Sequence, residues 1–548
     1  MKNFITKARL GLVFFLLIIN IVSAQVYFRL NQLGYLPNDI KTAIILSDNE
    51  LQGREFVVKN QNGKISDRGI IKQSIGEYGN FRYIYEIDFT LLSSIGKYYI
   101  QIADFRSPKF SIDHRLYNSI TDAVLSFYKV QRCGYTSPVG HEICHIADAT
   151  SLIENGVNKK TSIDVTGGWH DAGDYTKFLN TTAFTTYMLL FAYDFDPVKF
   201  GFDNNRNNIP DILEEAKIGL DWLIRASYNS KFITQVQDED DQTVGWRMPE
   251  DDPLQFDRPA FVGIGKNLIG IYVATLSLAS RIWQETLRYN SFAEKCLTLA
   301  ENYYSLRNNV PNISGAGTGV YIDKSFEGKM ALGAVELYLS TNRQQLLDEA
   351  RTYADLAKSD YWWSWGDINA LAHYRLSSFD KTHVEFLKNN LEHFHEFSKE
   401  NVFERGVDVS WGTNHAILGV VLQNIFYEKL TGDKSYSIMA SKQRDYILGR
   451  NPWGVSFVSD FGEIHTKYFH HQVAHFNGGK IPGAVAAGPI PKSILEERKI
   501  EFERPDRFVK FQTEDMVYFD DRMDYISNEP TISSNATALF VFGFFSSR

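Results

Sequence analysis

Residues 167–178 of this chain read GGWHDAGDYTKF, which places two carboxylates, Asp171 and Asp174, three positions apart behind a Gly-Gly-Trp segment. Glycine allows tight backbone turns that other residues resist, so both acids can face one cavity. Carboxylates can activate water, and an aromatic ring such as Trp169 can stack on a sugar. The stretch therefore favours a site that cleaves carbohydrate. The alternative is a polar loop whose aspartates cap local backbone, which Asp does readily.

Two cysteines and three histidines lie just before this stretch and inside it. Two thiolates and two imidazoles make a closed tetrahedral zinc set that leaves no position for water. The preferred ligands are Cys133, Cys144, His145 and His170, with His141 as the spare. We therefore predict a structural Zn²⁺ that ties this region to Asp171 and Asp174. Buried free thiols or a disulfide are the alternatives.

A second metal site is predicted in residues 203–214, DNNRNNIPDILE. Oxygen ligands occur there at the spacing that calcium loops use. The predicted Ca²⁺ ligands are Asp203, Asn205, Asn207, the Ile209 carbonyl, Asp211 and Glu214. Entry into a helix is the other interpretation, with Pro210 in the first turn and two acids favouring the helix dipole. Both interpretations can hold together.

The length of 548 residues indicates two or more domains. The composition, 44% hydrophobic and 22% charged, is ordinary for a globular protein. A net charge of -9 argues against a nucleic-acid partner, because no basic face is available for phosphates. Three cysteines are too few for a disulfide scaffold.

The N-terminus is typical of an export signal. Lys2, Lys7 and Arg9 precede the apolar residues 10–22, and Val22-Ser23-Ala24 offers a cleavage site. We expect residues 1–24 to be removed and the protein to be periplasmic or extracellular. An uncleaved anchor is the alternative. We expect no membrane span in the mature chain and a monomer.

Strand signals dominate residues 25–112. Runs rich in aromatic and β-branched residues, such as 81–87 and 98–102, are separated by turn signals. Short strands of this kind predict a small β-sandwich that supports the rest of the molecule.

From residue 113 onward the periodicity is helical, and we count about twelve apolar-periodic segments. They include residues 116–132, 182–194, 210–226, 266–285, 292–306, 344–357, 367–375, 383–399, 415–431, 435–448 and 535–545. This number of helices fits a closed toroid of two helix layers better than a bundle.

Further motifs lie near the C-terminus. Residues 448–458 read LGRNPWGVSFV, residues 469–472 read FHHQ, and residues 518–531 read YFDDRMDYISNEPT before the Ser-Asn-Ala of 534–536. With GGWHDAGDYTKF, these motifs resemble the family 9 glycoside hydrolases, the cellulase group with an (α/α)6 barrel. Residues 29–37, RLNQLGYLP, resemble the start of the Ig-like domain in one subgroup. The resemblance covers essentially the whole mature chain, and it implies an Ig-like domain over 25–112 and a barrel over 113–548.

The resemblance also implies roles for individual residues. Asp174 would be the general base and Glu529 the general acid, while Asp171 would hold or polarise the water. His470 and Asp520 would line the cleft and bind sugar hydroxyls. In the subgroup with the Ig-like domain, a zinc site of Cys, Cys-His and His is known, which the four preferred ligands match, and calcium is also usual.

Aromatic and imidazole rings are the expected sugar contacts. The candidates are Trp169, His471, Trp411, Trp365 and Tyr525. Trp246, Trp363 and Trp453 are further candidate platforms, and about half of the tryptophans are expected in the core. One departure from the family is Gln472, which follows two histidines where the family commonly has Arg. This difference bears on the substrate more than on the reaction.

We therefore expect an inverting enzyme that cleaves β-1,4-glucan as an endoglucanase, with no organic cofactor. Inversion needs one protonated carboxyl and one ionised carboxylate that holds water, about 6.5–9.5 Å apart. The alternatives within the class are activity on xyloglucan or mixed-linkage glucan, or an exo-acting cellodextrinase or glucosaminidase. A non-catalytic carbohydrate-binding protein and a zinc hydrolase are the rivals from other classes.

Overall fold

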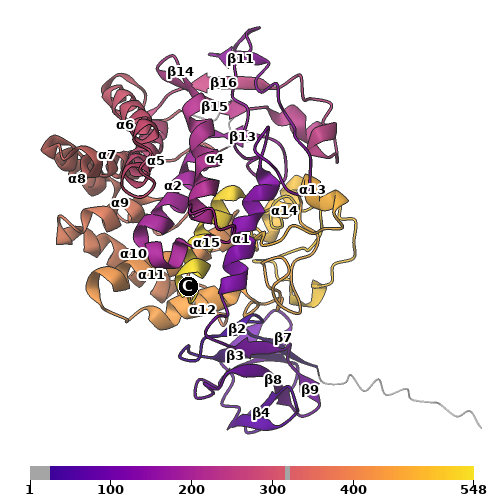
Figure 1. Ribbon diagram of the computed structural model, residues 1–548. Coiled ribbons are helices and arrows are strands. Elements are labelled where there is room, and N and C mark those ends of the chain that lie inside the picture. The colour runs from indigo at the N-terminus through magenta and orange to yellow at the C-terminus, as the bar shows by residue number, and fades with distance from the viewer. Residues whose placement is uncertain (1–24, 315–316, 318–320) are drawn as a thin grey trace, which may run out of the picture.

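The computed structural model describes residues 25–548 except 315–316 and 318–320. The predicted export signal, residues 1–24, lies outside the described residues. The described chain has an N-terminal β-sandwich and a larger, mainly helical domain (Figure 1). In the part of the chain that the structure describes, no helix is both long and apolar enough to cross a bilayer.

The sandwich consists of two sheets packed face to face. The first has the order β1 (Val26–Arg29), β3 (Thr42–Ser47), β7 (Phe81–Asp88), β6 (Gly76–Tyr78). The second has the order β2 (Gly34–Tyr35), β10 (Phe110–Ile112), β8 (Gly96–Ile102), β4 (Glu55–Asn60), β5 (Ile65–Ile70), with β9 (Phe105–Arg106) paired to β8. Alternate residues of β8, namely Tyr98, Ile100 and Ile102, point into the shared core, as the two-residue period of a strand requires.

The helical domain contains long helices that alternate between an inner and an outer position. Their bounds are α1 (Asn118–Gln131), α2 (Leu179–Phe195), α4 (Asp211–Arg225), α5 (Lys266–Glu285), α6 (Asn290–Ser305), α7 (Glu327–Thr341), α8 (Gln344–Ala357), α9 (Asn369–Leu376), α10 (Val384–Ser398), α11 (Thr413–Thr431), α12 (Ser437–Ile447) and α15 (Ile532–Phe545). Shorter helices are α3 (Pro197–Phe200), α13 (Gln472–Phe476) and α14 (Lys492–Arg498).

Contacts between these helices follow a ring. Helix α2 contacts α5, α5 contacts α7, α7 contacts α9, α9 contacts α11, α11 contacts α15, and α15 contacts α2 again. A second helix packs on each: α4 on α2, α6 on α5, α8 on α7, α10 on α9, α12 on α11 and α1 on α15. Inner helices such as α2 and α15 are buried along almost their whole length, whereas α4 buries one face, as an outer helix should.

A sheet inside the helical domain contradicts the expectation of purely helical structure after residue 113. Its order is β12 (Val157–Lys159), β11 (Ser151–Glu154), β16 (Pro259–Gly263), β15 (Lys231–Val236), β13 (Lys177–Phe178), with β14 (Ser227–Tyr228) paired to β15. Several of its strands are only two or three residues long, too short for a two-residue period to show in the sequence. The sheet lies at the end of the helical domain opposite the sandwich (Figure 1). Strand β13 forms the end of GGWHDAGDYTKF and so fixes that segment to the sheet.

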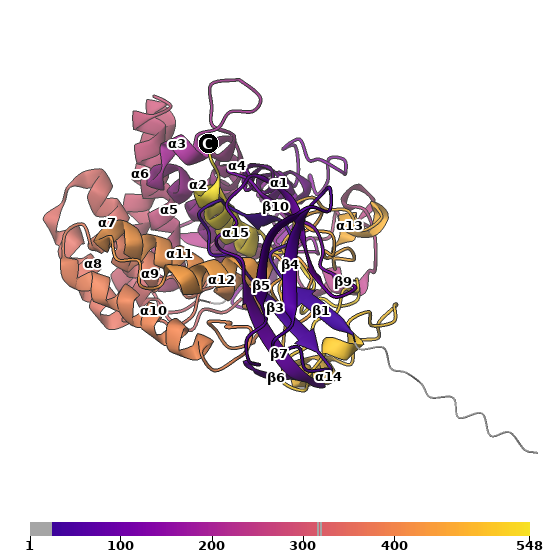
Figure 2. The same cartoon turned by 90° about the horizontal axis from the view of Figure 1, so that it is seen from below.

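Buried polar contacts join the sandwich to the helical domain. Arg450 is fully buried, and its guanidinium pairs with Glu86 of the sandwich at 2.7 Å and with Glu404 at 2.6 Å. The Asn31 amide donates to Asp445 at 2.7 Å. Figure 1 and Figure 2 both show the sandwich beside α12, the helix that carries Asp445. The two domains are therefore joined by specific contacts between side chains.

Replacing Arg450 by Met is expected to lower the free energy of unfolding by about 1–2 kcal/mol, because the buried Phe403 carbonyl loses its donor and Glu86 and Glu404 keep only Lys442 as a cationic partner among the described residues. Arg68→Met is the matched control. Arg68 pairs with Glu55 at 3.3 Å, but its side chain is 63% exposed, so its loss should cost about 0.5 kcal/mol or less. Urea denaturation of both variants measures the difference, and equal losses would show that the Arg450 contacts do not hold the domains.

Candidate active site

Two distant segments of the chain meet at Gly173. The backbone N–H of Gly173 donates to Glu529 Oε1 at 3.0 Å. A Cβ on residue 173 would lie 2.3 Å from the His470 carbonyl oxygen and 3.0 Å from Glu529 Oε1. Only glycine permits this approach. The loop formed by residues 171–174, called here the 171–174 loop, therefore touches the segment that enters α15.

Asp171 is the buried acid of the loop. Its Oδ1 accepts a hydrogen bond from the Thr181 hydroxyl, and its carbonyl accepts from the N–H of Ile532 in α15. Burial raises the pKa of Asp171 to about 7, against hydrogen bonds from Thr181 and Tyr321 that favour the ionised form. This acid therefore lies near the balance between its charged and neutral states at neutral pH.

Asp174 and Glu529 lie in different environments. Asp174 is half-buried, and its Oδ1 accepts from the N–H and the hydroxyl of Thr176 at 3.2 and 2.5 Å. Burial raises the pKa of Glu529 well above its ordinary range, and the negative charge of Asp174 raises it further. The environments thus favour a proton on Glu529 and charge-stabilising hydrogen bonds on Asp174, which suits an acid and a base in one site.

His470 lies beside the carboxylates. Its Nδ1 donates to the Arg522 carbonyl at 2.6 Å, and its backbone N–H donates to the Asn528 carbonyl at 3.2 Å. Burial lowers the pKa of its imidazole. A neutral ring whose Nδ1 carries the proton leaves Nε2 as an acceptor for a substrate hydroxyl.

Tyr321 is a site residue that sequence reasoning missed. Burial raises the pKa of its phenol, and the negative charges of the nearby Asp171, Glu529 and Asp174 raise it further. Tyr321 therefore lies near all three acids. Its ring packs against Phe178 at 4.8 Å and Trp365 at 5.2 Å. No motif surrounds this tyrosine in the sequence, so only the fold reveals it.

The structure corrects three predicted substrate contacts. Asp520 accepts from the N–H groups of Lys467 and Tyr468 at 3.0 and 2.9 Å and pairs with Arg507 at 2.6 Å, so its carboxylate is occupied within the protein. Trp169 is 1% exposed, and its indole donates to Glu215 at 2.8 Å. His471 is 2% exposed and bonds to Gln131 at 2.6 Å. All three side chains are buried and bonded to partners within the protein.

The remaining rings divide by exposure. Trp363 and Trp453 are buried in the core. Trp411 is 46% exposed and lies 6.1 Å from Tyr525, whose ring is in turn 5.9 Å from His470. Trp365 is half-buried beside Tyr321, and Trp246 is half-buried beside His470 at 5.1 Å. These four aromatic rings remain the predicted sugar platforms.

Trp411→Ala is expected to raise KM for long glucan oligosaccharides about tenfold with little change in melting temperature, because stacking on one exposed ring is worth about 1–2 kcal/mol. Trp363→Ala is the contrasting variant, and it should cost about 3–5 kcal/mol of stability by leaving a core cavity. Kinetics and thermal unfolding of both variants separate the two roles. A Trp411 variant that loses stability but not affinity would show that this ring is structural.

The four preferred zinc ligands converge in the fold. One ligand atom each of Cys133, Cys144, His145 and His170 lies within 4.8 Å of all the others, and all four residues are buried. His145 Nε2 lies 3.0 Å from Asp252 Oδ2, which leaves Nδ1 facing the cluster. A carboxylate behind a ligand histidine is the usual way to fix its ring. The donor set, burial and orientation fit a four-coordinate structural metal.

His141 lies outside this set. Its two ring nitrogens are 2.8 Å from the Glu142 carbonyl and 3.0 Å from the Val130 carbonyl. This agrees with its prediction as the spare histidine.

Buried ion pairs connect the metal cluster to the 171–174 loop. Asp148 pairs with Lys177 and Arg258, each at 2.6 Å, and Arg258 donates to the Tyr175 carbonyl at 2.7 Å. Lys177 Nζ lies 3.8 Å from Cys133 Sγ. These contacts therefore link the cluster to Tyr175, the residue that follows Asp174.

The loop of residues 203–214 enters α4, as the helix-entry interpretation predicted. Pro210 precedes the helix, and Asp211 and Glu214 lie in its first turn. The loop side chains bond to one another: Asn205 donates to Glu214 at 2.7 Å, and Asp203 accepts from the N–H of Asn208 at 2.8 Å. Ca²⁺ binding here stays a prediction.

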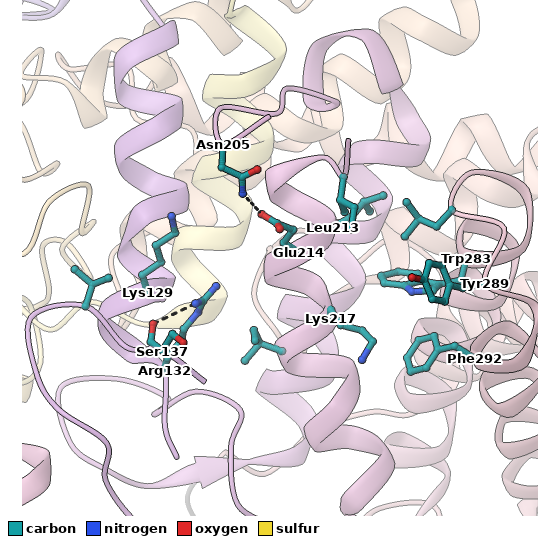
Figure 3. A pocket seen from close by; sticks show the side chains of 14 residues that line it. Lys129, Arg132, Ser137, Asn205, Leu213, Glu214, Lys217, Trp283, Tyr289 and Phe292 are labelled. Atoms are coloured by element: carbon teal, nitrogen blue, oxygen red, sulfur yellow. Dashed lines mark hydrogen bonds between the residues drawn. The ribbon is translucent and has the colours of Figure 1, made fainter. Parts of the chain in front are cut away.

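A cavity lies at another place, between helices of the helical domain. It has a volume of about 780 Å³ and is lined by residues of α1, α4, α5, α6 and their loops, including Trp283, Phe292 and Lys217 (Figure 3). None of its lining residues belongs to the acid pair or to the metal cluster. The chemistry of the site therefore rests on the carboxylates and not on this cavity.

Comparison with known proteins gives relatives along most of the chain. Endoglucanase D of Acetivibrio thermocellus is 26% identical over 79% of this chain and 73% of its own length. The xyloglucan-specific endo-beta-1,4-glucanase BoGH9A of Bacteroides ovatus is 24% identical over 93% of this chain and 92% of its own. The crystal structure of a metagenome-derived glycoside hydrolase family 9 endoglucanase aligns with a TM-score of 0.81 at 25% identity, covering 96% of this chain and 99% of that one.

Family comparison covers both domains. The family described as "Cellulase N-terminal ig-like domain" matches residues 23–107, which agrees with the observed sandwich. The family described as "Glycosyl hydrolase family 9" matches residues 117–542, more than half of the chain. This chain belongs to glycosyl hydrolase family 9.

Proposed function

We propose that this glycoside hydrolase cleaves β-1,4-glucosidic bonds in cellulose-like β-glucans by an inverting mechanism, as an endoglucanase. The observation that supports it most is the meeting of Glu529 with the 171–174 loop at Gly173, with a raised pKa on Glu529. The endoglucanases among the relatives support the substrate class.

In the proposed reaction, Glu529 gives its proton to the glycosidic oxygen as the bond to the anomeric carbon breaks. Asp174 takes a proton from a water molecule, and the water oxygen attacks the anomeric carbon from the opposite face of the ring. The sugar product leaves with inverted configuration. Asp171 helps to hold the water, and Thr176 orients Asp174 through the two hydrogen bonds to its Oδ1.

We propose that the scaffold is an (α/α)6 barrel. The ring of contacts among α2, α5, α7, α9, α11 and α15, with an outer helix on each, supports it. The inner helices would then place the 171–174 loop and Glu529 at one end of the barrel.

We propose Zn²⁺ as the metal of Cys133, Cys144, His145 and His170, since two thiolates and two imidazoles suit it. When bound, it supplies a structural cross-link and no reaction chemistry, because four protein ligands fill its coordination. Asp252 orients His145. The residues of the N-terminus support export to the periplasm or outside the cell. The monomeric state stays a prediction.

Xyloglucan is the second candidate substrate. The relative from Bacteroides ovatus named for it aligns with nearly the whole of both chains. Branched xyloglucan needs a cleft with more room beside the main chain than cellulose does.

Viscosity and reducing ends, measured together on hydroxyethylcellulose, mixed-linkage glucan and xyloglucan, test the proposal. An endoglucanase is expected to lower the viscosity steeply while few reducing ends appear. Reducing ends without a fall in viscosity would indicate exo action. Hydrolysis of xyloglucan alone would favour the second candidate, and no release from any of these glucans would reject the proposed function.

A further inference from the structure

Gln472 connects the 171–174 loop to residues 245–247. Its backbone N–H donates to the Gly173 carbonyl at 2.9 Å, so it is bound directly to the 171–174 loop. Its side chain is 8% exposed and points toward residues 245–247. No role in the reaction proposed above uses this side chain.

The amide of Gln472 bonds to the backbone on both sides of Trp246. Its Oε1 accepts from the N–H of Arg247 at 2.8 Å, and its Nε2 donates to the Gly245 carbonyl at 3.3 Å. One acceptor and one donor are needed to satisfy these two backbone groups, and an amide has both. A guanidinium or ammonium has only donors, and a carboxylate has only acceptors.

Residues 245–247 are also fixed to the other side of the 171–174 loop. Tyr175 donates its hydroxyl to the Arg247 carbonyl at 2.6 Å, and its backbone N–H donates to Asp241 at 2.8 Å. The Arg247 guanidinium pairs with Asp241 at 2.6 Å and with Asp252 at 2.8 Å. Hydrogen bonds and peptide bonds thus connect Gly173 through Gln472, Arg247 and Tyr175 back to Asp174.

Trp246 is the ring that these bonds to Gly245 and Arg247 hold in place. It stacks on His475 with centroids 4.7 Å apart and planes at 15°, and its centroid is 5.1 Å from that of His470. His470 is itself in the segment bound to the 171–174 loop. A change of a few tenths of an ångström in residues 245–247 would therefore move an aromatic face relative to the carboxylates.

We propose that Gln472 is a positioning residue that sets substrate affinity by fixing Trp246 against the 171–174 loop. The kinetic part of this inference rests on the proposed function, while the structural part does not. Gln472 does not touch the reacting atoms in this account; it acts through the backbone of Arg247 and Gly245.

A double-mutant cycle between Gln472→Met and Trp246→Ala tests the kinetic part. Methionine keeps the length of the side chain but can neither accept from Arg247 nor donate to Gly245 as an amide does. Gln472→Met is expected to raise KM for cellopentaose about tenfold with kcat within about threefold, and to have no further effect on KM in the Trp246→Ala background. Multiplicative effects on KM in the double variant, or a fall in kcat alone, would overturn the inference.

Amide hydrogen exchange of residues 245–247 tests the structural part in the full-length protein without any substrate. The Arg247 N–H is expected to exchange at least tenfold faster in Gln472→Met than in the wild type. Gln472→Glu retains the acceptor and serves as a second variant in which the Arg247 N–H should stay protected. Unchanged exchange in Gln472→Met would overturn the inference. If the wild type cleaves none of the glucans, the proposed function fails, and the exchange measurement still decides the role of Gln472.

Discussion

Glu529→Gln is expected to slow glucan hydrolysis about a thousandfold while substrate binding is retained, because general acid catalysis contributes about 10²–10⁴ in rate. The glutamine amide can still accept from the N–H of Gly173, the bond that joins Glu529 to the 171–174 loop. It cannot protonate the leaving oxygen. Hydrolysis rates and binding of cellopentaose by calorimetry measure the two effects separately.

The Glu529→Gln variant should lose activity but gain stability. Burial raises the pKa of Glu529 in the folded protein. A raised carboxyl pKa gives stability that is fully present below the unfolded pKa and is lost as pH rises through the folded pKa. Glutamine does not ionise, so Glu529→Gln should gain in melting temperature relative to wild type as the pH is raised above 5.

Glu514→Gln is the matched control for both effects. The Glu514 side chain is 84% exposed and pairs only at the surface with Lys492. Its rate and its pH dependence of stability should equal those of the wild type. A Glu529→Gln variant that hydrolyses glucan at the wild-type rate would show that another group is the acid.

Loss of the metal is expected to have the second-largest effect. Cys133→Ser removes one ligand of the cluster and should reduce bound zinc from one equivalent to nearly none. A metal present at about a thousand times its Kd adds about 4 kcal/mol of stability, so we expect the melting temperature of a domain of this size to fall by about 4 °C. Elemental analysis and thermal unfolding provide the two measurements.

Cys296→Ser is the control, because Cys296 is also a buried free cysteine but lies on α6, outside the metal cluster. It should keep its zinc. A chelator should abolish activity only as the 171–174 loop loosens and not at once, since no step of the proposed reaction uses the metal. Immediate loss of activity with unchanged thermal stability would favour the zinc hydrolase that the sequence left as a rival.

Helices with regular apolar periodicity could be predicted closely from the sequence. Helix α8 (Gln344–Ala357) has the predicted bounds and buries one stripe of residues. Helix α5 (Lys266–Glu285) also has the predicted bounds: it is buried along almost its whole length, but charged residues mark its first and last positions. Helix α2 extends beyond its predicted 182–194 at both ends, since it is buried on all sides and has no polar face to mark its limits. The strands β11, β13, β15 and β16 pair with partners far away in the chain, which no local pattern shows.

Residue types and spacing indicated the site, but they did not show which way each side chain points. The four metal ligands and the approach of Glu529 to the 171–174 loop agree with the motifs. Trp169, within the deciding stretch, points into the core, where Glu215 accepts from its indole. Tyr321 approaches the acids from a segment without a motif. Orientation depends on packing between distant elements, which becomes visible only in the folded chain.

The configuration of the first product tests the central claim most directly. Proton NMR during hydrolysis of cellopentaose resolves the anomers before mutarotation equalises them. If Asp174 activates water while Glu529 protonates the leaving oxygen, the newly formed reducing end appears first as the α-anomer. Initial formation of the β-anomer would contradict the account, because it requires a covalent intermediate and a carboxylate that acts as nucleophile.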